Sequence, residues 1–344
     1  MTSLPRRTTR VLSLTAFVYL SSTIMVLASE RVYWYWSGFG ADSVLTLGGF
    51  YLIPAMAGLW ALALTPARFA HHVVLAAAIF AFVVEGVLTP IIYLDGPLPI
   101  MAAMFVGWHG LIAFVGFWYF VRRLLLAGQL RHLALGSALF GAFWGVWALS
   151  SAVSTPSDAA EVAESGGDPT LLVPGEFLLY AGLVGVTLAV AHWLIGYVWP
   201  TAWKPGRRST LALAAVAGIY MSVAVLPGVF WAPLKLGVLL WGTWRLLRRP
   251  VSVDAECEPT VLDRLAGRVL LRHALVLMFM PVAAAATYLV LWQFRSNVSF
   301  LGTLYGGLVV LQIVAGAWAF VWAWRRGRIS ASTPNTITKP LWAG

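Results

Sequence analysis

The feature that most constrains this chain is a series of long apolar stretches separated by short segments that carry arginine. Most stretches reach the roughly 20 residues that an α-helix needs to cross ~30 Å of membrane hydrocarbon. Charged residues make up only 10% of the 344 residues, whereas a soluble domain carries about 25%. Because so little polar surface is available to face water, we expect an all-α, polytopic integral membrane protein that forms a single helical bundle.

About ten transmembrane helices are expected from the lengths of these stretches. The stretches at 210–226 and 230–247 are short, and they fit either two tight spans or one re-entrant hairpin. The first stretch also fits a signal peptide cleaved after Ala28, but its length and the aromatic residues that follow it favour a retained span. The expected spans are 11–29, 45–65, 73–93, 98–121, 133–154, 173–198, 210–226, 230–247, 273–293 and 300–324.

The positions of the basic residues predict the orientation of the chain. If the N-terminus lies in the cytoplasm, all but three of the 23 Lys and Arg residues fall in cytoplasmic segments. Because cytoplasmic loops of membrane proteins are enriched in Lys and Arg, we expect both termini in the cytoplasm and the protein in the cell (inner) membrane. The net charge of +10 indicates contact with anionic membrane lipids and not with nucleic acid, since the arginines are spread between the spans.

Two connecting segments are distinguished by their charge. Residues 151–172 hold only acidic charges, which predicts a flexible acidic outer loop. Residues 248–272 make the longest expected cytoplasmic segment, and arginines recur in it at positions 264, 268 and 272. This spacing predicts a short amphipathic helix over 261–271 that lies on the inner lipid headgroups.

Two ionisable residues are expected deep in the membrane. Glu85 and His109 lie at similar distances from the short turn at 94–97, so their helices are antiparallel neighbours and the two side chains share a depth in the outer half. An ionised group inside a bilayer costs roughly 2.5–3.5 kcal/mol, which makes both residues candidates for function. The pair predicts either a proton-relay, ligand or metal site, or a structural hydrogen bond that locks the hairpin.

Four further charged residues are expected near the outer ends of spans. Their ordinary role is to reach the outer headgroups, but together with Glu85 and His109 they would form a mixed-charge cavity for substrate binding or proton coupling. These four residues are Glu30, Arg31, Glu176 and Lys235.

Cofactor signals in the sequence are weak. His72 and His192 are the pair that we consider for haem ligation, because a bis-histidine site needs two imidazoles facing across one cavity. Cys257 is the only cysteine, which excludes a thiolate metal site, and no metal site is expected.

Small and polar residues inside the spans predict helix packing. Gly141 with Gly145, and Gly302 with Gly306, are spaced to form packing seams between helices. We expect Tyr220 and Gln312 to form hydrogen bonds between helices.

Three classes of function remain open. The chain carries no P-loop, HExxH or GxSxG motif. The first class is a transporter or lipid-handling protein with a polar intramembrane pocket in the outer half. The second is an intramembrane enzyme that uses His109 and Glu85, with or without a metal or haem. The third is a non-catalytic subunit of a membrane complex, which would have membrane partners or a second copy of this chain.

Overall fold

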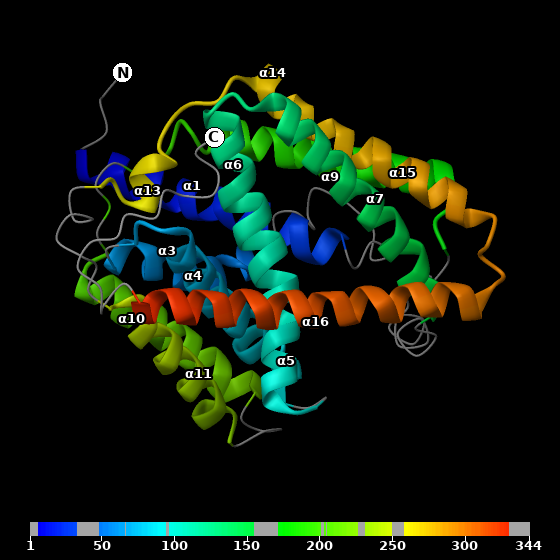
Figure 1. Cartoon of the computed structure of the whole chain (residues 1–344). Coiled ribbons are helices and arrows are strands. Elements are labelled where there is room, and N and C mark those ends of the chain that lie inside the picture. The colour runs from blue at the N-terminus through cyan, green and yellow to red at the C-terminus, as the bar shows by residue number, and fades with distance from the viewer. Residues whose placement is uncertain are drawn as a thin grey trace.

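A computed structural model describes residues 6–32, 48–65, 67–93, 96–154, 171–200, 203, 205–225, 231–249 and 258–329. Within these ranges all regular structure is helical, and Figure 1 shows a bundle of helices that cross at steep angles. The acidic residues of the expected outer loop, and residues 250–257 of the expected cytoplasmic loop, lie outside the described residues.

In the described part of the first half, the elements form five helices or runs of helix, three of which change from α-helix to π-helix along their length. The elements are α1 (Arg6–Val26) with η1 (Leu27–Arg31), α3 (Leu52–Leu64), α4 (Ala70–Val83) with η3 (Val84–Leu88), a short 3-10 turn η4 (Pro90–Tyr93), α5 (Leu98–Phe105) with η5 (Val106–Val121) and α6 (Arg122–Leu126), and α7 (Leu130–Ser154).

The second half contains shorter and more exposed helices around one long terminal helix. The elements are α9 (Pro174–Leu194), α10 (Arg207–Tyr220) with η6 (Met221–Val225), α11 (Ala232–Leu247), α13 (Val261–Arg264), α14 (Leu271–Ala274) with η7 (Leu275–Met278) and α15 (Phe279–Trp292), and α16 (Val298–Ile329).

Seven of these helices are long and apolar enough to cross a membrane, so the fold is that of a multi-pass helical membrane protein. A helix is present at every expected span, but α3, α10 and α11 fall short of the length or hydropathy of the other seven. The seven candidate spans are Val11–Arg31, Ala70–Leu88, Leu98–Leu126, Leu130–Val153, Pro174–Leu194, Leu271–Trp292 and Val298–Gly327.

The centre of the bundle is α4. Its span is 94% buried, and it contacts α3, η5, α11 and α16. Alanines at positions 76, 77, 78 and 81 keep this helix thin, which allows four neighbours to approach it closely. In contrast, the span of α16 is only 17% buried. Among the candidate spans, burial is therefore highest in α4 and lowest in α15 and α16, at 39% and 17%.

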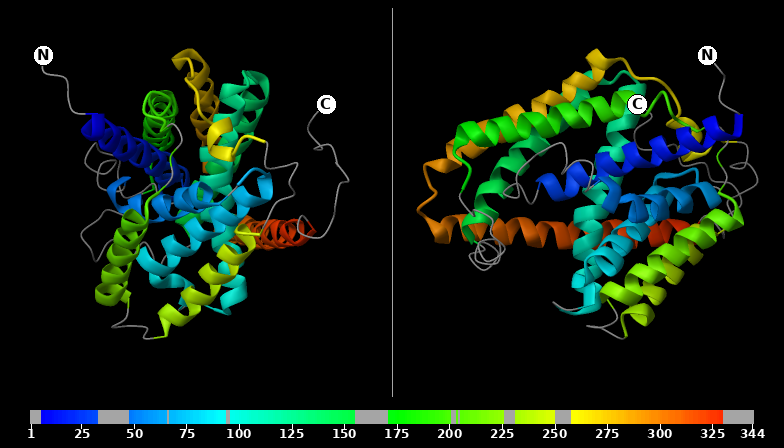
Figure 2. Two further views of the ribbon diagram at one scale, coloured as in Figure 1. Left: turned by 90° about the vertical axis from the view of Figure 1, so that its left-hand side faces the viewer. Right: turned by 180° about the vertical axis from the view of Figure 1, so that it is seen from behind.

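Two groups of helices pack on either side of α16. Helices α7, α9 and α15 contact one another, whereas α10 and α11 contact α3 and α4 respectively (Figure 2). Helix α16 contacts both α7 and α4. At 32 residues it is about 48 Å long, and a helix that exceeds the ~30 Å of hydrocarbon is accommodated by tilting.

Glycines set two of the close helix crossings. A Cβ added at Gly141 or Gly145 would overlap the backbone of α15, so the predicted seam there is confirmed. A second crossing joins Gly107 of η5 to Gly316 of α16, where each glycine meets the backbone of the other helix. An added Cβ at Gly306 meets nothing within 4 Å, so the predicted second seam is wrong at this position.

The expected amphipathic helix over 261–271 is only partly correct. A Thr260–Asp263 capping box starts α13, but the helix ends at Arg264. Gly267 adopts a φ of +156°, outside the helical region, and regular helix resumes at Leu271. The intervening carbonyl groups are instead used by a buried arginine of α6, which is described below.

Candidate functional site

The structure brings Glu30, Glu85 and His109 together from three different helices. Nε2 of His109 lies 2.5 Å from Oε1 of Glu85, and Nδ1 of the same ring lies 3.8 Å from Oε1 of Glu30. The relative exposures of these three side chains are 2%, 7% and 23% in the order His109, Glu85 and Glu30. One imidazole is thus held between two carboxylates inside the bundle. We call Glu30, Glu85 and His109 the central triad.

Each member of the central triad lies on a π-helical segment. Glu30 belongs to η1, Glu85 to η3 and His109 to η5. A π-helical turn carries an extra residue, which rotates the side chains that follow relative to an α-helix, and such turns recur at functional sites. Glycines at positions 86, 107 and 110 flank the triad and let neighbouring backbones and side chains approach it.

Hydrogen bonds extend the triad at both ends. The Tyr51 hydroxyl donates to Oε1 of Glu30, and the Thr89 hydroxyl donates to Oε2 of Glu85 over 2.9 Å. The hydrogen bonds therefore join His109, Glu85 and Thr89 on one side and Tyr51 to Glu30 on the other, and the 3.8 Å contact between Nδ1 of His109 and Glu30 is an ion-pair distance and not a hydrogen bond. Charge-assisted bonds of this kind are about twice as strong as neutral ones, so the network fixes the carboxylates in place.

Aromatic rings cover the imidazole of His109. The rings of Phe105 and Trp108 stack against it with centroids 6.2 and 5.6 Å away, and the ring of Tyr51 is tilted over it at 6.5 Å. These rings keep the triad in an apolar environment, where the interaction between its charges is stronger than in water.

Arg31 adds a fourth charged group. Its side chain is buried and interacts electrostatically with Glu30, and its carbonyl oxygen accepts a 2.6 Å hydrogen bond from Tyr180. With both carboxylates ionised, the four groups are together neutral when His109 is protonated and carry a charge of −1 when it is not. One proton therefore switches the net charge of the cluster.

The other two residues expected at this site have different described contacts. The Glu176 carboxylate is exposed and accepts a 3.1 Å hydrogen bond from the Val173 N–H at the start of its own helix. The Lys235 ammonium lies 6.0 Å from the ring of Trp231. Of the six charged residues expected at this site, the described contacts bring together Glu30, Arg31, Glu85 and His109.

The two histidines considered for haem occupy different surroundings. Nδ1 of His72 accepts a 3.2 Å hydrogen bond from the Phe69 N–H, and its ring lies 4.1 Å from that of His71. His192 is buried beside Arg122. Among the described residues, no group of three or more His, Cys, Asp or Glu side chains is arranged to hold a metal ion.

Arg122 is a buried cation. The sequence predicts that it lies at the cytoplasmic end of a span, but not that its side chain faces the interior of the bundle. Its guanidinium donates to the carbonyl oxygens of Leu265, His192 and Gly267 at 2.9, 3.3 and 2.7 Å. It also lies 4.4 Å from the ring of Trp199. Arg122 thus ties the segment after α13 to α6 and α9.

Two members of the hydrogen-bond network were not among the expected site residues. Thr89 lies four positions after Glu85, which is one helical turn, so its contact follows from helical spacing. Tyr51 comes from the beginning of another apolar stretch, and no spacing rule connects it to Glu30.

Comparison of the chain with protein-family models, with curated proteins and with solved structures gave no significant match. The fold and the site therefore define only the class of this protein. It is a multi-pass helical membrane protein with a buried charged cluster.

Proposed function

We propose that this protein is a proton-coupled transporter of the cell membrane, in which the central triad takes up and releases the coupling proton. The observation that supports this is the imidazole of His109 held between the carboxylates of Glu30 and Glu85 in a buried site. Three ionisable groups inside a bilayer are costly, and proton relays in membrane transporters are built from Asp, Glu and His. A purely structural role for His109 would need only one hydrogen-bond acceptor, whereas this site offers two carboxylates.

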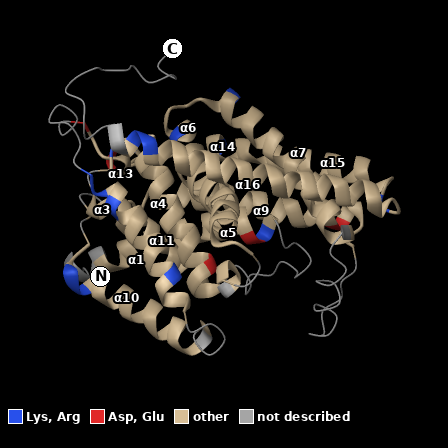
Figure 3. Cartoon of the chain, turned by 60° about the horizontal axis from the view of Figure 1, so that its bottom comes forward, with Lys and Arg blue, Asp and Glu red and all other residues tan. Residues whose placement is uncertain are grey.

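The proposed topology has ten crossings with both termini in the cytoplasm. Helices α1 and α4 each end at the triad, so their C-terminal ends lie at one depth and the two helices run in the same direction. The chain must then cross back between them, and α3 is the helix available for this. Figure 3 supports the direction, because Lys and Arg gather at the side of the bundle that carries α13 and α6.

This topology places the central triad in the outer half of the membrane. Glu30 and Glu85 lie within one turn of the ends of their spans at Arg31 and Leu88, which are the outer ends in this orientation. A proton would travel a short distance from the outside to the triad. It would travel a longer distance from the triad to the cytoplasm. The π-helical turns are the local elements that we expect to rearrange between these two states.

The proposal is tested with purified protein reconstituted in liposomes. An inward proton gradient is applied in the presence of a mixture of metabolites, and the contents are then analysed by mass spectrometry. We expect gradient-dependent accumulation of at least one compound by the wild type, and its loss in Glu85→Gln and His109→Gln. Glu176→Gln is the matched control, because this side chain is exposed.

Three outcomes overturn the proposal. Uptake that persists in both triad variants shows that the triad does not couple transport. Chemical conversion of a compound without a gradient assigns the protein to the enzyme class. Absence of uptake by the wild type, with Glu85→Gln and His109→Gln changed only in thermal stability, assigns the triad to a structural role. Size-exclusion profiles and thermal unfolding establish in each case that the variants are folded.

A further inference from the structure

We infer that a crevice between η5 and α7 binds one acyl chain of an anionic phospholipid, with the lipid headgroup at the α6–α7 turn. This inference depends on the membrane assignment of the fold and not on the transport proposal. Its test measures lipid binding and would leave the transport experiment unaffected.

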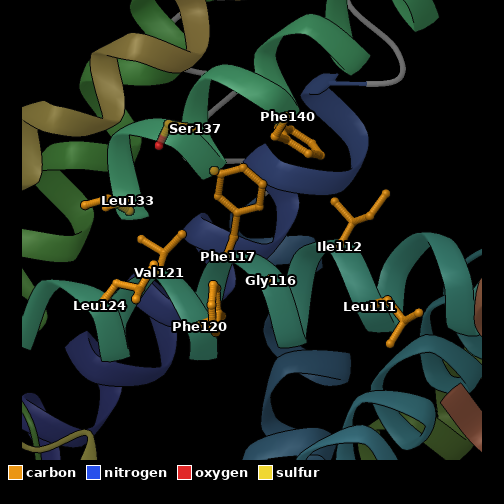
Figure 4. A pocket seen from close by; sticks show the side chains of 11 residues that line it. Leu111, Ile112, Gly116, Phe117, Phe120, Val121, Leu124, Leu133, Ser137 and Phe140 are labelled. Carbon is orange, nitrogen blue, oxygen red and sulfur yellow. The ribbon is translucent and has the colours of Figure 1, made fainter. Parts of the chain in front are cut away.

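The crevice is apolar and open to the side of the bundle. It has a volume of about 230 Å³, which is below the roughly 300–1,000 Å³ of pockets for small molecules. Ser137 is the only polar side chain among its lining residues, and Phe120 at its edge is 50% exposed (Figure 4). A narrow apolar space that opens toward lipid suits a slender hydrocarbon chain and not a bulky polar ligand.

The crevice follows the direction of an acyl chain. It extends along α6 and η5 from Leu124, close to the α6–α7 turn, to Leu111 near the middle of the span, and along α7 from Leu133 to Phe140. These positions cover about 20 Å along α6 and η5 and about 10 Å along α7. Phe117 and Phe140 pack edge to face with centroids 4.8 Å apart and form part of its wall.

Glycine creates part of the space on α7. An added Cβ at Gly136 meets nothing within 4 Å, and Gly136 lines the crevice. A larger side chain at this position would therefore enter the crevice without displacing neighbouring side chains or backbone.

The end of the crevice at the turn is positively charged. Arg123, Arg131 and His132 are exposed there, and residues 122–132 contain no acidic side chain. His132 lies four positions before Gly136, so both are on one face of α7. The first turn of α7 adds the positive end of its helix dipole. Phosphate groups of anionic lipids are the membrane component that matches this charge, and each arginine near a membrane surface strengthens the attraction.

The test compares lipid binding by native mass spectrometry. Purified protein is titrated with phosphatidylglycerol and with phosphatidylcholine of the same acyl chains. We expect the wild type to retain one phosphatidylglycerol more tightly than phosphatidylcholine. Gly136→Leu should lose this retained lipid, and Arg123→Gln with Arg131→Gln should lose about fivefold in phosphatidylglycerol affinity for each arginine.

Two variants serve as matched controls. Gly182→Leu adds a side chain in open space on another span, and Arg272→Gln removes an exposed arginine at another helix end. Both should bind phosphatidylglycerol as the wild type does. Retention that is unchanged in Gly136→Leu would overturn the crevice as the binding site. Equal affinity for the two lipids, or no effect of the arginine substitutions, would overturn the assignment of an anionic headgroup. Thermal unfolding of each variant establishes that it is folded.

Discussion

At the scale of single residues, Glu85 and His109 form a buried contact between two ionisable side chains. Both side chains are buried, and Oε1 and Nε2 are 2.5 Å apart. Removing one partner of a buried ion pair leaves the other without compensation, which costs about 3–5 kcal/mol. Removing both partners together avoids that penalty.

We therefore expect non-additive effects on stability. Glu85→Ala and His109→Ala should each lower the free energy of unfolding by about 3–5 kcal/mol, and the double variant should fall short of the sum by about 1–3 kcal/mol. Equilibrium unfolding in mixed detergent micelles measures all four proteins. Glu176→Ala, which removes an exposed helix cap, should cost at most about 1 kcal/mol. Additive losses would show that the two side chains do not form a pair.

Arg122 and Arg123 provide a second comparison, because adjacent arginines have opposite surroundings. Arg122 donates to three carbonyl groups, whereas Arg123 is exposed. Lysine cannot reproduce the planar fork of a guanidinium, so Arg122→Lys should lose about 2–4 kcal/mol of stability. Hydrogen exchange should rise at residues 265–267, which would be released from α6. Arg123→Lys should leave both measurements unchanged, and equal effects would contradict the anchoring role of Arg122.

The sequence predicts only some of these residue contacts. Glu85 and His109 could be placed at one depth because a short turn fixes the register of two adjacent helices. Glu30 joins them through packing between helices that are distant in the chain, which no local pattern encodes. Likewise, successive side chains of an α-helix are rotated by about 100° around its axis, and this rotation decides whether Arg122 or Arg123 faces the interior. The π-helical segment before these two residues changes the rotation, so the sequence does not predict which arginine is buried.

At the scale of secondary-structure elements, the crossing of α5–η5 with α16 positions the triad. Gly107 lies two residues before His109, and it meets the backbone of α16 at Gln312. Gly316 meets the backbone of α5 at Ala103. The two glycines allow the helices to touch backbone to backbone, so the orientation of His109 depends on this contact.

Substitution on α16 tests this dependence. Gly316→Ala places a methyl group against the Ala103 carbonyl oxygen, so the helices must separate, at a cost of about 1–3 kcal/mol. Gly306→Ala on the same helix meets open space and should be neutral or up to about 1 kcal/mol stabilising. Thermal unfolding measures both variants. If Gly316→Ala is as stable as Gly306→Ala, the crossing is looser than the structure indicates.

The apolar stretches predict where the helices occur more accurately than which helices span the bilayer. Each expected span contains a helix, because an apolar segment in lipid must satisfy its backbone internally. The lengths of α3 and α11 are 13 and 16 residues, or about 20 and 24 Å, which is less than the hydrocarbon thickness. Composition alone cannot distinguish a short span from a re-entrant hairpin, since both bury the same apolar side chains.

At the scale of the whole molecule, the arrangement of α10 and α11 decides how many times the chain crosses. Helix α10 has no buried residue, and it begins with Arg207 and Arg208. Ten crossings place Trp231, between these two helices, on the outside. A hairpin that enters and leaves on one side places it on the cytoplasmic side or within the bilayer. The crossings before α10 and after α11 are the same in the ten-crossing and the hairpin arrangements. The side of the membrane on which position 231 lies therefore distinguishes the two.

Single cysteines and a membrane-impermeant maleimide measure this on intact cells. In a Cys257→Ser background, which removes the only native cysteine, we expect Trp231→Cys and Asn297→Cys to react from outside. Gln129→Cys at the α6–α7 turn should react only after permeabilisation. All three positions are exposed. Reaction of Trp231→Cys only from the cytoplasmic side would make α10 and α11 a re-entrant hairpin and leave the triad in the outer half. Reaction of Gln129→Cys from outside would invert the chain, and the triad would then take its proton from the cytoplasm.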